Sequence, residues 1–147
     1  MPSGTSTLGS VAAMAPDRLR PAVVLAAFTL LVWTTRIRNI WTDESLETSG
    51  QVGRTALSLS FTAFAVATLL VWWQGRRTGV VPERAGMVVR LFAAWTIGVW
   101  AVRAFQIAAG DHGAAFVAVH TALAVASTVL AVWAVRSSAP AREPVTS

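Results

Sequence analysis

The sequence predicts an all-α fold, a bundle of four transmembrane helices. Of its 147 residues, 54% are hydrophobic and 13% are charged, whereas a soluble globular domain carries about 25% charged residues. Four segments also have the length of about 20 largely apolar residues that a helix needs to cross a bilayer. A bundle of soluble helices is the alternative, and it is disfavoured because too little polar sequence remains to cover a water-facing surface.

The predicted helices differ in how well they fit a membrane span. They cover residues 21–41, 55–73, 85–109 and 113–135. The second has no charged residue, and the fourth has His120 as its only ionisable group. The third carries Arg90 and Arg103 near its two ends. The first reaches full length only by continuing through Arg36 and Arg38, whose long side chains then have to extend toward the interface.

Residues 1–20 and 136–147 flank the membrane domain of residues 21–135. Both ends are short of apolar runs, which predicts disordered cytoplasmic tails. Residues 1–20 lack the basic start and the continuous apolar core of a signal peptide. Met14 is a second candidate for the start of translation beside Met1, and N-terminal mass spectrometry distinguishes the two.

The distribution of arginine predicts the orientation of the helices. With four spans, the two termini and the middle connection share one side, which carries eight arginines: Arg18, Arg20, Arg76, Arg77, Arg84, Arg90, Arg136 and Arg142. The opposite side carries four, which are Arg36, Arg38, Arg54 and Arg103. Because basic residues are retained on the cytoplasmic side, we expect a multi-pass protein of the cell (plasma) membrane with both termini in the cytoplasm.

An internal repeat relates the two halves of the membrane domain. Residues 25–40 and 92–107 align without a gap and share seven of sixteen positions. The identical pairs are Ala26/Ala93, Ala27/Ala94, Thr29/Thr96, Val32/Val99, Trp33/Trp100, Arg36/Arg103 and Ile40/Ile107. The next helices align from Arg54 and from His120, at an offset one residue shorter. The pattern favours tandem duplication of a helical hairpin, with a pseudo-two-fold axis along the membrane normal.

Four basic or potentially basic side chains meet at the outer end of the predicted bundle: Arg36, Arg54, Arg103 and His120. A charge inside a bilayer normally faces the bundle interior or a water-filled cavity and has a partner. One interpretation is an outward-facing cationic vestibule that binds an anion or an anionic head group. The other is structural, in which the arginines extend to the interface or are neutralised by nearby acids. These acids are Asp43, Glu44, Glu47 and Asp111.

Other kinds of site find little support. The chain has no cysteine, and the two histidines, His112 and His120, lie too close together on one segment to bind opposite faces of a single haem. We therefore expect no metal and no cofactor. No nucleophile–base pair or other catalytic constellation stands out, and an enzyme is the least favoured class. The arginines are scattered around apolar segments, which argues against nucleic acid as a partner.

Two stretches resemble an uncharacterised family of small, two-helix actinobacterial membrane proteins. The first is Asn39-Ile40-Trp41-Thr42-Asp43, similar to an N-I-W-x-D motif after the family's first helix. The second contains Ala115, Phe116, Val119, His120, Leu123 and Ser127, similar to A-F-x-x-V-H-x-x-L with a later serine. The resemblance implies descent from a two-helix ancestor by duplication, and it implies no activity.

Two functions remain open for such a protein beside the least favoured one, a membrane enzyme. A structural or accessory membrane subunit is the favoured one, because the sequence contains no complete site. A small transporter or channel for an anionic solute is the alternative, suggested by the outer arginines and the repeat. Apart from the lipid bilayer, the expected partners are further copies of the chain or another membrane protein.

Overall fold

The computed structural model describes residues 15–42 and 48–139. Within these ranges the chain is entirely helical, with a short 3-10 helix, η1 (Pro16–Leu19), and four α-helices. The α-helices are α1 (Arg20–Thr42), α2 (Thr48–Thr78), α3 (Ala85–Ala109) and α4 (Ala114–Ser137). Each is long and apolar enough to cross a membrane, so the predicted all-α, four-span fold is confirmed.

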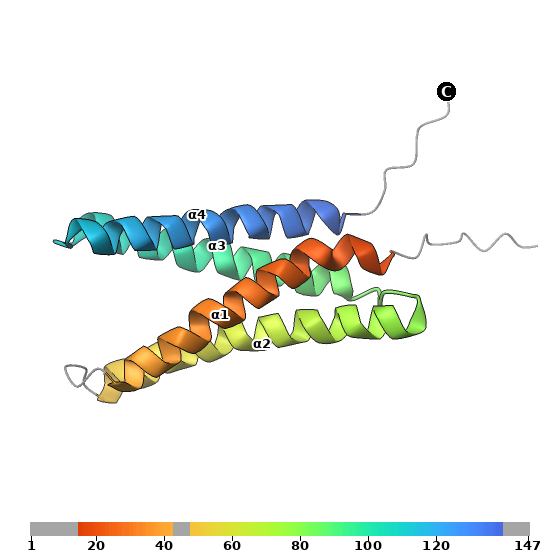
Figure 1. Ribbon diagram of the computed structural model, residues 1–147, viewed down its shortest axis with the longest axis horizontal. Helices are drawn as coiled ribbons and strands as arrows, with labels where there is room; N and C mark the ends of the chain where they lie inside the picture. Colours follow the sequence, from red (N-terminus) through yellow and green to blue (C-terminus); the bar gives the residue numbers. More distant parts are fainter. Residues whose placement is uncertain (1–14, 43–47, 140–147) are drawn as a thin grey trace, which may run out of the picture.

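The helices form two hairpins that lie side by side (Figure 1). α1 packs mainly on α2, and α3 packs mainly on α4. Contacts between the hairpins run from α1 to α4 and, least extensively, from α2 to α3. The spatial order is therefore α1, α2, α3, α4 around the bundle, as expected for antiparallel neighbours joined by short connections.

Three helices, α1, α2 and α4, extend beyond their expected bounds. α2 covers Thr48–Thr78 rather than 55–73, because helical hydrogen bonding continues through polar residues that hydropathy excludes. It stops before Gly79, whose positive φ of 74° favours glycine. Residues 16–20, expected in the N-terminal tail, are helical, and Leu19 is buried. α4 continues through Arg136 and Ser137, both expected in the C-terminal tail, and Ser138 is buried. Residues 1–14 and 140–147 of the expected tails lie outside the described residues.

The packed core lies in the half of the bundle nearest the termini. Leu25, Phe61 and Phe92 are fully buried there. Toward the opposite end, α3 buries no residue after Trp100 and α4 buries none before Ser127. We call this opposite end, where α1 and α3 end and α2 and α4 begin, the distal end. In Figure 1 the two hairpins lie apart at the distal end, on the left of the view.

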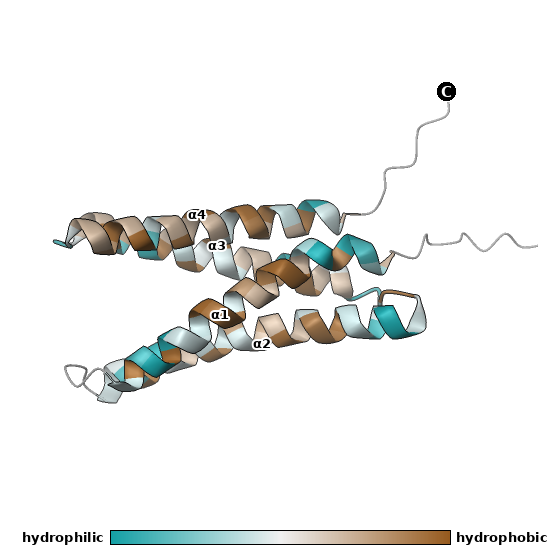
Figure 2. Cartoon of the chain, in the orientation of Figure 1, coloured by the Kyte–Doolittle hydropathy of each residue, from teal (hydrophilic) through white to brown (hydrophobic). Residues whose placement is uncertain are grey.

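The outer surface of the bundle is apolar over most of its length. Large apolar side chains such as Leu31, Phe105 and Val129 are exposed. Figure 2 shows hydrophobic residues along all four helices and hydrophilic ones concentrated near their ends. An apolar exterior with polar ends is the surface that a lipid bilayer solvates.

The C-terminal end of α2 carries an aromatic and basic cluster. The guanidinium of Arg77 lies 3.7 Å from the ring centroid of Trp73, and that of Arg76 lies 5.7 Å from the ring centroid of Trp72. Both pairs are within cation–π range. Tryptophan and arginine side by side are typical of a membrane–water interface, so this end of α2 has the composition of an interfacial anchor.

Candidate anion-binding site

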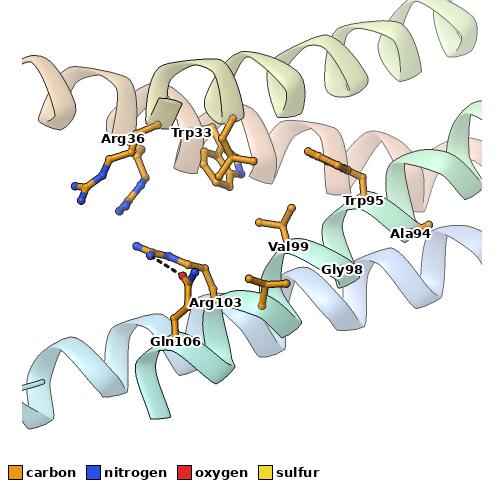
Figure 3. Close-up of a pocket in the computed structure, with 11 residues that line it drawn as sticks. Trp33, Arg36, Ala94, Trp95, Gly98, Val99, Arg103 and Gln106 are labelled. Atoms are coloured by element: carbon orange, nitrogen blue, oxygen red, sulfur yellow. Dashed lines mark hydrogen bonds between the residues drawn. The ribbon is translucent and has the colours of Figure 1, made fainter. Parts of the chain in front are cut away.

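Three arginines from three different helices line one cleft at the distal end. Arg36 comes from α1, Arg54 from α2 and Arg103 from α3, and the cavity between them has a volume of about 580 Å³. Arg36 and Arg103 are half-buried, whereas Arg54 is exposed. In Figure 3 the side chains of Arg36 and Arg103 extend from facing helices toward the same end of the cleft.

Helix periodicity explains why Arg36 and Arg103 reach this cleft. Each follows a tryptophan, Trp33 or Trp100, by three residues, so that arginine and tryptophan lie on the same face one turn apart. Both tryptophans are only 7% exposed. Burial of the aromatic side chain therefore turns the arginine one turn later toward the interior of the bundle.

Gln106 orients the guanidinium of Arg103. Nη1 of Arg103 donates a hydrogen bond to Oε1 of Gln106 over 3.2 Å, within α3 (Figure 3). Gln106 itself is exposed and lines the same cleft. An arginine has five N–H donors, so this single bond leaves most of the donors of Arg103 available to a further acceptor.

Apolar side chains line the rest of the cleft. They are Trp33 from α1, Leu57 from α2, and Ala94, Trp95, Gly98, Val99 and Val102 from α3. The ring of Trp33 stacks on that of Phe61, with centroids 4.1 Å apart. Nε1 of Trp95 donates to Oγ of Ser60 over 3.1 Å, which ties α3 to α2. These contacts hold both cleft-lining tryptophans in position.

His120 lies in a second, smaller pocket next to the cleft. This pocket has a volume of about 40 Å³ and also contacts Arg36 and Arg103. The Nδ1 atom of His120 lies 2.9 Å from the carbonyl oxygen of Phe116. Since a carbonyl only accepts, Nδ1 carries the proton in this contact. His120, on α4, thus lines a pocket together with the same pair of arginines, and the structure brings all four basic candidates to the distal half of the bundle.

The acidic residues named as charge partners are only partly described. Asp43, Glu44 and Glu47 lie outside the described residues. Asp111 is exposed in the connection between α3 and α4. Among residues 15–42 and 48–139, the only ion pair joins Arg20 to Asp17 over 2.8 Å. Asp111 therefore neutralises none of the described arginines by direct contact.

The two histidines have a common aromatic neighbour. Phe116 contacts both rings, with centroid separations of 4.7 Å to His112 and 3.9 Å to His120. No group of three or more metal-binding side chains occurs in the described part of the chain. His112, in the connection before α4, therefore forms an aromatic stack with Phe116 and His120 of α4.

Among the cleft residues, Trp33 had a signal in the sequence, whereas Trp95 and Gly98 had none that pointed to the cleft. Trp33 belongs to the repeat, and its spacing to Arg36 is the pattern that points to it. Trp95 and Gly98 are separated from the arginines by one or more turns, and the Trp95–Ser60 bond joins residues on different helices. Only the relative rotation of α2 and α3 brings those two side chains together.

The chain was compared with models of protein families, with curated proteins and with solved structures, and no match was found.

Proposed function

We propose that this protein is an accessory membrane protein that binds an anionic group in the distal cleft. One observation supports this most directly: Arg36, Arg54 and Arg103, from three helices, surround a single cavity. Like charges that share a poorly solvated site repel one another, and an anion between them offsets that repulsion. Guanidinium groups also match carboxylate and phosphate oxygens in geometry.

The proposed location is the plasma membrane, with both termini in the cytoplasm. The excess of arginine on the side of the termini supports this orientation. The Arg77–Trp73 pair at the C-terminal end of α2 fits the inner interface. In this orientation the distal cleft faces the outer leaflet and the extracellular side.

A transporter or channel for an anionic solute is the second candidate, and the packing favours binding over passage. Toward the termini, the space beyond the cleft is filled by the fully buried side chains of Leu25, Phe61 and Phe92. A solute that entered the cleft would meet the Trp33–Phe61 stack rather than an open path. Transport would therefore require the hairpins to repack.

Calorimetry with inorganic phosphate tests the anion site. The protein, in nanodiscs of zwitterionic lipid, is titrated with phosphate and compared with Arg36→Gln and Arg103→Gln. Each substitution is expected to weaken binding about tenfold or more, since a hydrogen bond to a charged group contributes about 1.5–3 kcal/mol. Arg38→Gln is the matched control, because Arg38 is exposed on α1 and does not line the cleft.

Two results would contradict the proposal. One is that phosphate does not bind to the unmodified protein. The other is that Arg38→Gln weakens binding as much as the cleft variants do, which would indicate a general effect of net charge. Size-exclusion profiles of all variants check that the fold is retained.

The accessory role is tested by crosslinking in native membranes followed by affinity capture and mass spectrometry. The exposed apolar helix faces can pack on lipid, on another copy or on a different membrane protein. A stoichiometric partner supports an accessory subunit. Recovery of the protein alone, as a monomer, argues against it.

We further propose that the chain arose by tandem duplication of a two-helix hairpin, as its resemblance to the actinobacterial family implies. Burial supports this, because positions that align in the repeat are buried together. In α1 and α3 these pairs are Ala22/Val89, Leu25/Phe92, Ala26/Ala93, Thr29/Thr96 and Trp33/Trp100. In α2 and α4 they are Phe61/Ser127, Ala65/Ala131 and Thr68/Ala134.

Matched alanine substitutions test the equivalence of the hairpins. Ala26 and Ala93 are both buried, whereas their neighbours Ala27 and Ala94, also identical in the repeat, are both exposed. Ala26→Leu and Ala93→Leu should each lower the free energy of unfolding by about 1–3 kcal/mol through overpacking. Ala27→Leu and Ala94→Leu should change it little. Destabilisation at only one of the two buried positions would speak against pseudo-symmetry.

A further inference from the structure

The distal cleft is cationic at one end and apolar at the other. On α1, Trp33 precedes Arg36 toward the distal end, and on α3 Ala94 and Gly98 precede Arg103. α2 runs antiparallel to α1 and α3, and along its sequence the arginine comes first, with Arg54 before Leu57. All three helices therefore place their arginine distally and their apolar residues deeper, as Figure 3 shows for α1 and α3.

The depth of the cleft corresponds to one leaflet. Its lining on α3 extends from Ala94 to Gln106, which is about 18 Å along a helix at 1.5 Å per residue. Half of a hydrocarbon core of about 30 Å is about 15 Å. The apolar part of the cleft thus lies at the level of the acyl chains of the leaflet that borders the distal end.

The cleft opens sideways between α2 and α3. Its back is formed by α1, where Trp33 is buried and Arg36 half-buried, and its front by exposed residues such as Arg54 and Gln106. α2 and α3 are the neighbouring helices with the fewest contacts between them. Gly98 lines this side, and a Cβ atom there would meet nothing within 4 Å. Within residues 15–42 and 48–139 this side of the cleft is open, and it is the side that we assign to the bilayer.

We propose that the ligand of this cleft is an anionic phospholipid from the leaflet at the distal end, an inference that rests on the proposed anion-binding function. Its phosphate accepts hydrogen bonds from Arg36, Arg54 and Arg103, and part of one acyl chain lies against Trp33, Trp95 and Gly98. A volume of about 580 Å³ is that of a small-ligand site. The rest of the lipid extends into the bilayer between α2 and α3.

A free anion uses only half of this site. An inorganic phosphate would satisfy the arginines and leave the lining of Trp33, Leu57, Trp95 and Val99 without an apolar partner. A neutral lipid would fill the apolar half and offer the three arginines no anionic group. Only a ligand with both parts matches both ends of the cleft.

Fluorescence quenching by lipids brominated in the acyl chain tests the proposal. The protein is placed in nanodiscs of zwitterionic lipid with increasing fractions of a brominated lipid, either anionic phosphatidylglycerol or zwitterionic phosphatidylcholine. Trp33 and Trp95 line the cleft, so the part of the quenching that is lost in a Trp33→Phe, Trp95→Phe double variant reports a chain bound beside them. Half of the maximal quenching is expected at an about hundredfold lower fraction of the anionic lipid, the preference that three arginines near an anionic head group provide together.

Two substitutions test the cationic and the apolar half of the site one at a time. Arg103→Gln removes a cation, and Gly98→Phe fills the apolar half without changing charge. Gly53→Phe is the matched control, since a Cβ at Gly53 also meets nothing within 4 Å and Gly53 does not line the cleft. The preference for anionic lipid should disappear in both cleft variants and persist in the control. Inorganic phosphate should bind to Gly98→Phe as it does to the unmodified protein, and about tenfold more weakly to Arg103→Gln.

The outcomes distinguish the two proposals. Phosphate binding without any preference for anionic lipid, or a preference that Gly98→Phe leaves unchanged, overturns the lipid assignment and leaves the anion site standing. Absence of phosphate binding together with absence of a lipid preference overturns both.

Discussion

The indole Nε1 of Trp95 donates a hydrogen bond to Oγ of Ser60 over 3.1 Å, and this bond joins α3 to α2 beside the cleft. The same hydroxyl donates to the backbone oxygen of Leu57 over 2.7 Å. Ser60 is therefore both a donor and an acceptor, and its own helix orients it toward Trp95. Since α2 and α3 contact each other least among neighbouring helices, a single polar contact there has a large share in holding them together.

Ser60→Ala is expected to lower the free energy of unfolding by about 0.6 kcal/mol, the average for hydrogen bonds between membrane helices, and by no more than about 1.7 kcal/mol. The indole N–H of Trp95 loses its acceptor, and α2 and α3 lose their direct bond. Titration of the folded protein with a denaturing detergent, followed by circular dichroism, measures the change.

Thr62→Ala is the control for this substitution. The hydroxyl of Thr62 bonds only to the carbonyl oxygen of Ser58 in its own helix, so its loss should have a smaller effect. If Thr62→Ala and Ser60→Ala destabilise the protein equally, the contact with Trp95 contributes nothing measurable.

Hydropathy and helix periodicity were sufficient to predict the four helices and the end at which Arg36, Arg54 and Arg103 lie. Composition determines which segments a bilayer accepts. The direction of each helix then determines at which end of the bundle each of its residues lies. That Arg54 is exposed while Arg36 and Arg103 are half-buried could not be predicted, because it depends on the rotation and tilt of the packed helices.

The apolar half of the cleft was likewise beyond prediction. Tryptophan is common in membrane proteins at interfaces, so Trp95 carried no signal that it contacts Ser60 of another helix. The opening beside Gly98 arises because the hairpins separate toward the distal end (Figure 1). α4 buries only Ser127, Ala131 and Ala134, all in its half nearer the termini, and no local pattern in the sequence reveals that its other half lies apart from α1 and α2.

Gln106→Glu is expected to weaken phosphate binding. Nη1 of Arg103 already donates to Oε1 of Gln106, and a carboxylate at this position would form an ion pair three residues along the helix. That ion pair competes with the ligand for Arg103 and lowers the positive potential of the cleft. We expect an about tenfold increase in the dissociation constant, measured by calorimetry.

Gln74→Glu provides the matched control for charge. Gln74 is exposed near the other end of α2, far along the helix from Arg54. The substitution Gln74→Glu adds the same negative charge to the protein at a position that does not line the cleft. An equal loss of affinity in Gln74→Glu would mean that the net charge, and not the local ion pair, governs binding.

Trp33 and Trp100 occupy equivalent positions in the repeat and are equally buried, yet their substitution should have unequal effects. Trp33 stacks on Phe61 with an interplanar angle of 12°. The residue that aligns with Phe61 in the second hairpin is Ser127, which has no ring. Trp33→Ala should therefore lower the free energy of unfolding by about 0.5–1.5 kcal/mol more than Trp100→Ala, the contribution of one aromatic pair.

A double-mutant cycle with Phe61→Leu isolates this difference. The coupling energy between Trp33 and Phe61 should equal the excess cost of Trp33→Ala over Trp100→Ala, because neighbouring residues are not additive. A coupling near zero would show that the two rings pack without a specific interaction, and the difference between the hairpins would then lie elsewhere.

The absence of cysteine from the sequence makes single-cysteine labelling a direct test of orientation. Thr78 ends α2, directly after Arg76 and Arg77, and Asp111 lies between α3 and α4. Both are exposed, and they lie at opposite ends of the bundle. With both termini in the cytoplasm, a membrane-impermeant maleimide should label Asp111→Cys in intact cells, and Thr78→Cys only after permeabilisation. Labelling of Thr78→Cys alone in intact cells would reverse the orientation and place the cleft, with its three arginines, at the cytoplasmic leaflet. Labelling of both positions in intact cells would contradict any fixed orientation of the bundle.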